Sequence, residues 1–292
     1  MQIARIGTVR TALGECPVWD EKQGQLWMAD CRAGLILALD PDSGAARQWQ
    51  LPAPLGSFAL NGDDALVVAL KASFALLDLH AGSLCELASI GDSHPNLRLN
   101  DGAAMPDGSF VAGTMHIYRE PQEPPLGGLY RLDRQGGLAL LARGLGVVNG
   151  PGMDPSGSHL YVCDSSQRKI FRFQVGDDGG LREQEVFVDT QALGSAPDGC
   201  CFDAEGGLWT ALVHAGAIAR FDRQGRLDAR IDLPLRHPAS LCFGGADLDD
   251  IYVTSISDSG RLAADGPLDG ALLRVRGSGV RGAARPRCRI RL

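Results

Sequence analysis

The sequence predicts an all-β fold, a six-bladed β-propeller formed by residues 1–292 as one domain. Three observations lead to this prediction. Glycine accounts for 38 of the 292 residues without an every-third-residue period, which indicates many turns and excludes collagen. A phrase of short apolar stretches, separated by turns rich in Asp and Gly, occurs six times. No convincing amphipathic helix lies between these stretches, although a parallel α/β fold would need such helices.

The repeated unit consists of short alternating or β-branched stretches bounded by Gly, Asp, Asn or Pro, which is typical of hairpins. Its six copies lie at residues 18–44, 58–83, 103–115 with 127–137, 152–180, 201–225, and 241–260 with 270–275. Equivalent anchor residues in the copies are Trp27, Val67, Val111, Tyr161, Trp209 and Tyr252. They are spaced by roughly 40 to 50 residues, which is the period of a four-stranded propeller blade.

Two segments can be assigned a secondary structure only by comparison with the other copies of the repeat or with the closure of the ring. Residues 63–81 contain neither Gly nor Pro and could form a helix in isolation. The equivalent phase of the other copies is strand-turn-strand, so strands are expected here too. Residues 3–10 form an additional strand candidate, and we expect them to complete the sixth blade beside residues 271–292, because a propeller closes when one blade takes strands from both chain ends.

The charge pattern excludes several classes of partner. The formal net charge is −7 and no block of like charge is present, which argues against a nucleic-acid or anionic-membrane surface. Several arginines lie near the C-terminus, where a solvated tail or an edge strand is expected: Arg281, Arg285, Arg287, Arg289 and Arg291. No leader-like segment or apolar run of ~20 residues is present, so we expect a cytoplasmic protein, monomeric or weakly homo-oligomeric, that acts on a small molecule.

The spacing of the cysteines and histidines argues against disulfide bonds and zinc sites. The eight cysteines are scattered without a CxxC pair, which argues against a disulfide framework or a thiolate zinc site. Cys200 and Cys201 are adjacent, and we favour two small buried strand residues over a vicinal disulfide. The histidines form no HxH or HExxH pattern, which argues against a histidine zinc site.

Polar residues recur at one phase of the repeat, four or five positions before the bulky residue that ends each first strand. The oxygen-bearing side chains at this phase are Glu15, Asn100 with Asp101, Asn149 and Asp198, whereas the second and sixth copies have Gly56 and Ala239. In a propeller this phase converges on the central channel. Asp and Asn are also common beside glycine turns, but four copies in one phase, with Arg98 beside them, favour a site. Converging carboxylates repel each other unless a cation lies between them, and these oxygen ligands suit a divalent metal.

The sequence resembles the senescence-marker-protein/gluconolactonase/luciferin-regenerating-enzyme family, which includes regucalcin. The motifs that carry the resemblance are LGECPVWD at 13–20, RLNDGAAMPDGSFVAGTM at 98–115, VNGPGMDPSGSHLYVCDS at 148–165 and PDGCCFDAEGGLW at 197–209. The resemblance covers nearly the whole chain. It implies a six-bladed propeller with one divalent metal in its channel and hydrolysis of a sugar lactone.

By motif match, the resemblance places the metal ligands at Glu15, Asn149 and Asp198, and the catalytic acidic residue also at Asp198. It places sugar-contacting residues at Arg98 and Asn100. Calcium is the nominal metal, with zinc, manganese, magnesium or ferrous iron as alternatives.

The chain departs from the family at two places. Family members usually read GEGP where this chain has Cys16 after Glu15. Where some members carry an acidic substrate-binding residue after the GTM motif, this chain has Tyr118, with Glu120 nearby. Tyr118 and Glu120 are therefore further substrate-binding candidates, and the substituted position leaves the identity of the sugar open.

Three functions are compatible with the sequence. A metal-dependent lactonase would polarise the lactone carbonyl with its cation, and Asp198 would accept a proton from the attacking water. A metal-bound hydroxide attacking directly is the alternative route. An organophosphate esterase could use the same site, and a non-catalytic propeller could bind calcium. Arg98 favours the hydroxyl-rich lactone, and the complete Glu, Asn and Asp set disfavours the non-catalytic propeller.

Overall fold

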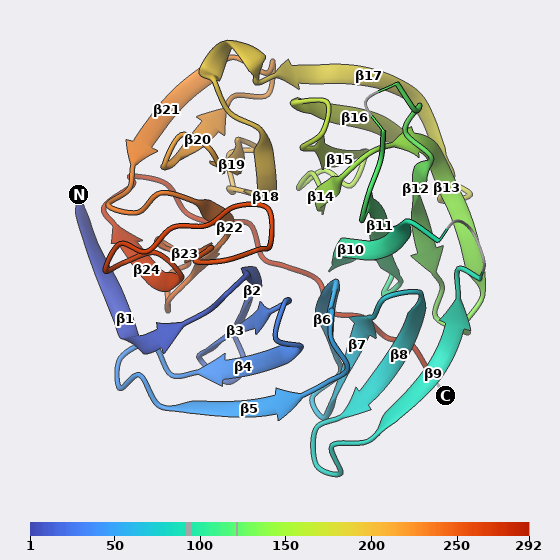
Figure 1. The fold of residues 1–292 in the computed structure, drawn as a ribbon, viewed down its shortest axis with the longest axis horizontal. Helices are drawn as coiled ribbons and strands as arrows, with labels where there is room; N and C mark the ends of the chain where they lie inside the picture. The colour runs from blue at the N-terminus through green and yellow to red at the C-terminus, as the bar shows by residue number, and fades with distance from the viewer. Residues whose placement is uncertain (92–94, 121, 292) are drawn as a thin grey trace.

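In a computed structural model, described for residues 1–91, 95–120 and 122–291, six four-stranded antiparallel sheets stand in a ring (Figure 1). This architecture confirms the predicted six-bladed β-propeller. Apart from the strands, the described residues contain one short 3-10 helix, Gln191–Leu193. None of the described helices is long and apolar enough to cross a membrane.

The first three blades follow one another along the chain, each from an inner to an outer strand. The first blade consists of β2 (Gly14–Asp20), β3 (Gln25–Asp30), β4 (Leu35–Leu39) and β5 (Ala46–Gln50). The second consists of β6 (Ser57–Asn61), β7 (Ala65–Ala69), β8 (Ser73–Asp78) and β9 (Leu84–Ser89). The third consists of β10 (Leu97–Ala104), β11 (Phe110–His116), β12 (Gly127–Leu132) and β13 (Leu138–Leu145). Strands β7 and β8 confirm that residues 63–81 form no helix.

The other three blades repeat this order, except that the sixth takes its outer strand from the chain start. The fourth consists of β14 (Val148–Met153), β15 (His159–Asp164), β16 (Lys169–Val175) and β17 (Leu181–Asp189). The fifth consists of β18 (Pro197–Phe202), β19 (Leu208–Leu212), β20 (Ala217–Phe221) and β21 (Leu227–Asp232). The sixth consists of β22 (Pro238–Gly244), β23 (Asp250–Ser255), β24 (Ala271–Arg276) and β1 (Gln2–Arg10).

Ring closure occurs in the sixth blade as expected. Strand β1 pairs antiparallel with β24, in a register that runs from Gln2 opposite Arg276 to Arg10 opposite Ala271. The terminal strand therefore covers the edge that β24 would otherwise expose to solvent. Residues 277–291, however, do not extend this blade, and this part of the prediction is wrong.

The core lies between the blades rather than inside one sheet. In β3, the alternating residues Leu26 and Met28 pack toward the sixth blade, while Trp27 and Ala29 pack toward the second. Such alternation puts successive side chains on opposite faces of a strand, so both faces are buried. Apolar clusters of this kind fill all six spaces between neighbouring blades. The packing of each sheet against the next therefore determines the position of each inner strand beside the channel.

Aromatic side chains contribute to these interfaces. Trp19 stacks on Tyr252 across the first and sixth blades, and Trp209 meets Phe243 edge-on across the fifth and sixth. Trp27 stacks on Trp49 of its own blade, and the Trp49 indole donates to the Leu79 carbonyl of the second. The tryptophans thus pack the blades against one another.

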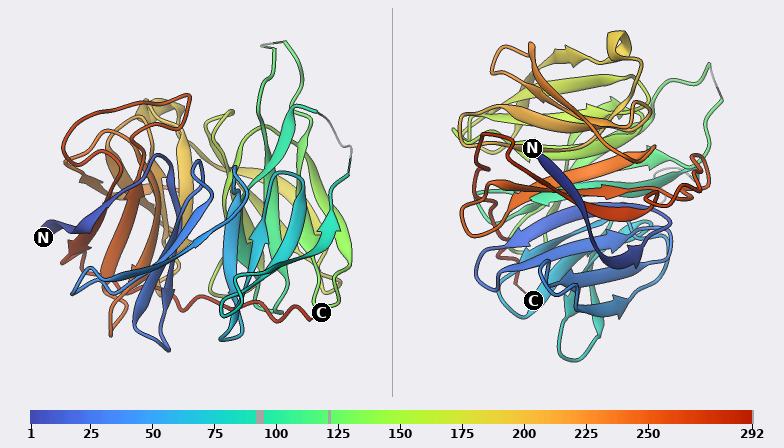
Figure 2. Two further views of the ribbon diagram at one scale, coloured as in Figure 1. Left: turned by 60° about the horizontal axis from the view of Figure 1, so that its bottom comes forward. Right: turned by 90° about the vertical axis from the view of Figure 1, so that its left-hand side faces the viewer.

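The C-terminal strap, residues 281–291, crosses one end of the channel on the face opposite the segment that follows β11 (Figure 2). Its backbone is hydrogen-bonded to Phe202 and Ala204 of the fifth blade region at one end, and to Leu60 and Gly108 at the other. The sequence predicted a solvated tail or an edge strand for the arginine-rich end. The structure shows neither, so this prediction is wrong. The side chains of the strap find acceptors on the blade ends, so it is held in place.

Candidate active site

The candidate site residues lie where the inner strands are irregular. The pairing of β2 with β3 shifts register between Glu15 and Val18, and the pairing of β14 with β15 shifts between Asn149 and Gly152. Equivalent shifts occur in the third blade after Leu99 and in the fifth after Pro197. A bulge turns side chains out of the regular alternation, and bulges are frequent at functional sites. The sixth blade, which has Ala239 at this phase, also shifts, between Pro238 and Ser240, whereas the second blade pairs β6 with β7 without a shift.

The bulge also explains the unusual Cys16. Its backbone has φ of 51°, in the left-handed region, and Gly150 occupies the equivalent place after Asn149 with φ of 47°. Left-handed backbone is costly for a residue with a β-carbon and easy for glycine. Cys16 therefore stands where the fold favours glycine, and its thiol donates to the Asp101 carboxylate at 3.3 Å.

Glu15 and Asp198 are brought together in the channel as buried carboxylates. The two residues are 9% and 6% exposed, and Glu15 Oε2 and Asp198 Oδ1 have no hydrogen-bond partner among the residues that the structure describes. Burial raises the pKa of Glu15 well above its ordinary value, and the charges of Asp198 and Asp101 raise it further. Burial and the Asp101 charge likewise raise the pKa of Asp198. Buried carboxylate oxygens that lack hydrogen-bond partners and repel each other are stabilised by a nearby positive charge.

Asn149 and Asn100 join this pair through a short amide network. Asn100 Nδ2 donates to the Asn149 side-chain oxygen at 2.7 Å and to the Val148 carbonyl at 2.8 Å. Asn149 Nδ2 donates to the Ser165 hydroxyl, which in turn donates to the Pro197 carbonyl next to Asp198. The network fixes which atom of Asn149 is the oxygen and holds it at the channel. It also uses both amide hydrogens of Asn100, so Asn100 can offer only its oxygen to a ligand.

The oxygen atoms of Glu15, Asp198 and Asn149 decide whether a cation fits this site. Two orphaned carboxylate oxygens and one fixed amide oxygen are the ligand types that hard divalent cations prefer. No group of three His, Cys, Asp or Glu side chains able to hold a metal occurs within residues 1–91, 95–120 and 122–291. The predicted set contains only two such side chains, because its third member is an amide.

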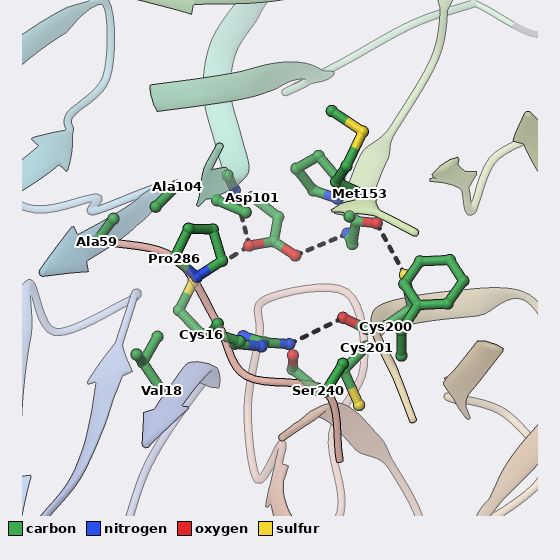
Figure 3. Close-up of a pocket in the computed structure, with 18 of the residues that line it drawn as sticks. Cys16, Val18, Ala59, Asp101, Ala104, Met153, Cys200, Cys201, Ser240 and Pro286 are labelled. Carbon is green, nitrogen blue, oxygen red and sulfur yellow. Dashed lines mark hydrogen bonds between the residues drawn. The ribbon is translucent and has the colours of Figure 1, made fainter. Parts of the chain in front are cut away.

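Asp101 lies on the side of the channel that the C-terminal strap closes. Its two oxygens accept from Cys16 and Gly102 and from the Gly150 amide, which lies in the fourth blade. It lines a cavity together with Cys16 and Cys200, on to which the strap residue Pro286 packs (Figure 3). Glu15 and Asp198 do not line this cavity. Asp101 thus ties three blades together beneath the two carboxylates.

Two cations lie near carboxylates of the channel, Arg98 near Glu15 and Arg285 near Asp101, although the sequence indicated only Arg98. Burial lowers the pKa of Arg98, and the negative charge of Glu15 opposes that shift. The second cation is Arg285 of the strap, which lines the cavity beside Asp101. Its guanidinium donates to the carbonyls of Pro17, Cys200 and Leu241, in three different blades. Sequence reasoning missed Arg285 because nothing in a non-repeating tail indicates that it folds back under the ring.

A second cavity, called the mouth below, lies on the face of the ring opposite the strap. It is lined by His116, Ile117, Tyr118, Arg119, Gly146, Val147, Ser166 and Arg261. Tyr118 therefore lies at the mouth, largely exposed, and its hydroxyl donates to Glu120, which is exposed and is not part of the lining. The sequence did not indicate Arg119 or Arg261. Arg119 could have been suspected because it lies close to the GTM motif in the sequence. No sequence feature indicates Arg261.

All eight cysteines are free, with Cys200 and Cys201 buried in β18, as the favoured interpretation had it. Burial raises the pKa of Cys201 to about 12, which keeps this thiol protonated and unreactive near neutral pH.

The chain is similar to a family of known proteins. A family model described as the SMP-30/gluconolactonase/LRE-like region matches residues 13–257. The chain is 34% identical over 280 residues to a 6-deoxy-6-sulfogluconolactonase of Pseudomonas putida, covering 94% of each chain. It is 31% identical over 283 residues to regucalcin of Xenopus laevis, covering 93% of each. The fold is similar to that of a solved luciferin-regenerating enzyme, with a TM-score of 0.89, 24% identity and 99% of each chain covered.

Proposed function

The chain belongs to the SMP-30/gluconolactonase/LRE-like family, and on that premise we propose that it is a metal-dependent hydrolase that opens the ester ring of a sugar lactone. The product is the corresponding sugar acid. The observation that carries this proposal is the pair of buried carboxylates, Glu15 and Asp198, each with one oxygen that no described residue satisfies. The relative named for a sulfonated gluconolactone adds support for the lactone.

In this proposal Glu15, Asn149 and Asp198 hold one divalent cation, with calcium as the nominal ion. When bound, the cation supplies positive charge that polarises a carbonyl and stabilises the negative charge developing on its oxygen. Glu15 and Asp198 are suited to it because protein donors leave their facing oxygens free. The buried surroundings strengthen every such interaction relative to water.

Asp198 accepts a proton from the attacking water in the proposed reaction and returns one to the ring oxygen as the ester opens. Burial favours this role, because it raises the pKa of Asp198 and so makes the carboxylate a better base. Coordination of a cation works in the opposite direction. The balance between these two effects decides how effective Asp198 is near neutral pH.

Arg98 and Asn100 orient the sugar. Arg98 already donates through one nitrogen to the Leu99 carbonyl, and a guanidinium has further N–H groups with which to bind hydroxyls. Asn100 accepts rather than donates, since its amide hydrogens are used within the protein. Tyr118 at the mouth, with Glu120 next to it, is proposed to contact the distal part of the substrate.

The test uses the purified full chain, stripped with a chelator and supplied with calcium, manganese, zinc or magnesium in turn. Hydrolysis of aldonolactones is followed by acid release at constant pH. We expect activity that disappears with chelation and returns with at least one metal. Activity that is indifferent to chelation would contradict metal dependence, and hydrolysis of a phosphotriester but of no lactone would favour the organophosphate esterase.

Replacement of Asp198 separates its two roles. Asp198→Asn keeps an oxygen that can coordinate but removes the proton acceptor, so hydrolysis should fall by roughly 10²–10⁴-fold even at saturating metal. Asp249→Asn, at an exposed position on the sixth blade, is the control and should leave activity unchanged. Recovery of the Asp198→Asn variant at high metal concentration would show that Asp198 is a ligand only.

A further inference from the structure

The mouth carries more positive charge than the proposed reaction uses. Arg119 and Arg261 line the mouth cavity, and no carboxylate is among its lining residues in the described part of the chain. Neither arginine forms an ion pair with a described residue, whereas nine of the other eighteen arginines outside the strap pair with Asp or Glu. The lining itself is therefore cationic in a chain of net charge −7, and the nearby carboxylate is the exposed Glu120, which accepts from Tyr118. Clefts lined by one sign of charge concentrate ligands of the opposite sign.

The Arg261 side chain is held in position by hydrogen bonds that leave some of its N–H groups unused. Its Nη2 donates to the His116 carbonyl at 2.6 Å and to the Ile117 carbonyl at 2.7 Å. These bonds tie the loop after β23 to the end of β11, in a different blade on the far side of the mouth. Nε and Nη1 donate to no residue in the described ranges. The guanidinium held in this way can still bind an oxyanion through a charge-assisted hydrogen bond from Nη1.

Arg119 and Arg98 add positive charge to that of Arg261. Arg119 is half-buried at the cavity wall, and its N–H groups meet no acceptor among the residues the structure describes. Arg98 lies within electrostatic range of both Arg261 and Glu15. Arg98 therefore provides positive charge near both Arg261 of the mouth and Glu15 of the carboxylate pair.

We propose that Arg119 and Arg261 form a subsite for a negatively charged substituent of the lactone, such as a phosphate, sulfonate or carboxylate, at the end of the sugar away from the ring ester. This inference rests on the proposed lactonase function and adds the substrate class to it. The neutral hydroxyls of the sugar lie with Arg98 and Asn100, and the anionic group remains at the mouth.

The first test compares D-glucono-1,5-lactone with the same lactone carrying a 6-phosphate. We expect wild type to favour the phosphorylated lactone at least about tenfold in kcat/KM, the discrimination that one hydrogen bond to a charged group provides. Arg119→Gln and Arg261→Gln should each remove about tenfold of kcat/KM for the phosphorylated lactone, mainly through KM. Their activity on the neutral lactone should stay within about threefold of wild type. Arg143→Gln, on the exposed outer strand β13 of the same blade, should change neither.

The second test does not depend on hydrolysis. Calorimetric titration with 6-phosphogluconate and with gluconate, the two ring-opened acids, measures the subsite directly. Wild type should bind the phosphorylated acid at least about tenfold more tightly, and Arg119→Gln should abolish the difference. Inorganic phosphate should compete with 6-phosphogluconate if the subsite recognises the phosphate itself.

The outcomes separate the two proposals. Equal use of both lactones together with equal binding of both acids would overturn the subsite and leave the lactonase intact. Preferential binding of 6-phosphogluconate without hydrolysis of any lactone would leave the subsite intact and contradict the lactonase. Because Arg261 also anchors a loop, thermal unfolding of Arg261→Gln is measured, and Arg119→Gln, whose side chain anchors nothing, decides the case if that loop is disturbed.

Discussion

The two carboxylates of the channel are the residues that carry most of the chemistry, and they also make the apo protein sensitive to pH. Glu15 and Asp198 come from the first and fifth blades, and the inner strands of both blades bulge at that level. Cys16 accepts a left-handed backbone as part of the same bulge. Single side chains here are therefore placed by the fold at some local cost.

We expect the free energy of unfolding of chelator-treated protein to decline with rising pH because of this pair. The folded state raises the pKa of both carboxyls, so it holds protons that the unfolded chain releases above about pH 4. Their contribution is complete below the unfolded pKa and is lost as the pH rises through the raised pKa. The slope is at most about 1.4 kcal/mol per pH unit for each group.

Urea unfolding between pH 4.5 and 8, in chelator, measures this decline. The variant carrying Glu15→Gln and Asp198→Asn lacks both titrations, so wild type should lose stability relative to this variant as pH rises. Saturating metal should restore stability to wild type most strongly at the alkaline end, since protons and cation compete. A difference from the variant that is constant with pH would contradict the electrostatic account of the pair.

Among the elements, the C-terminal strap is the one whose role differs most from expectation. It connects the fifth blade to the second and third across the channel, and Cys288 and Ile290 extend the apolar core between the latter two. Arg285 holds its middle by donating to three carbonyls. The strap therefore closes one end of the channel, and the arginine-lined mouth lies on the opposite face of the ring.

Arg285→Met should lower the free energy of unfolding by about 2–3 kcal/mol, because the carbonyls of Pro17, Cys200 and Leu241 lose a charged donor and Asp101 loses its nearest strap cation. Arg281→Met is the matched control in the same segment. The Arg281 side chain is 68% exposed and lies 3.7 Å from Asp247, so its loss should cost less than about 0.5 kcal/mol. Equal effects of the two substitutions on urea unfolding would show that the Arg285 contacts contribute little.

At the scale of the whole molecule, the ring is held by close contact between neighbouring blades near its axis. Gly113 of β11 faces Val148 of β14, and a β-carbon at Gly113 would lie 2.0 Å from Val148 Cγ1 and 2.3 Å from its Cβ. A β-branched valine has little rotameric freedom with which to retreat. Glycine at this position therefore sets the distance between the third and fourth blades.

Gly113→Ala should destabilise the protein by about 1–3 kcal/mol, the usual cost of overpacking. Gly152→Ala in the neighbouring β14 is the control, since the nearest atom to its β-carbon would be Phe202 Cε2 at an ordinary 3.6 Å. Thermal unfolding monitored by tryptophan fluorescence distinguishes the two variants. If Gly113→Ala unfolds like wild type, the blades can separate more freely than the contact implies.

The sequence by itself determined the blade count, the strand-turn phrase, ring closure by β1 and the phase that holds Glu15, Asn149 and Asp198. These features are periodic, and a repeat makes residues comparable even when they are far apart in the chain. Only the tertiary structure decided the features that do not repeat: the course of the strap, the place of Arg285 and the meeting of Arg119 with Arg261. Arg261 lies 145 positions from the His116 carbonyl that it binds. Local patterns carry no information about such contacts, because the packing of whole blades brings the two segments together.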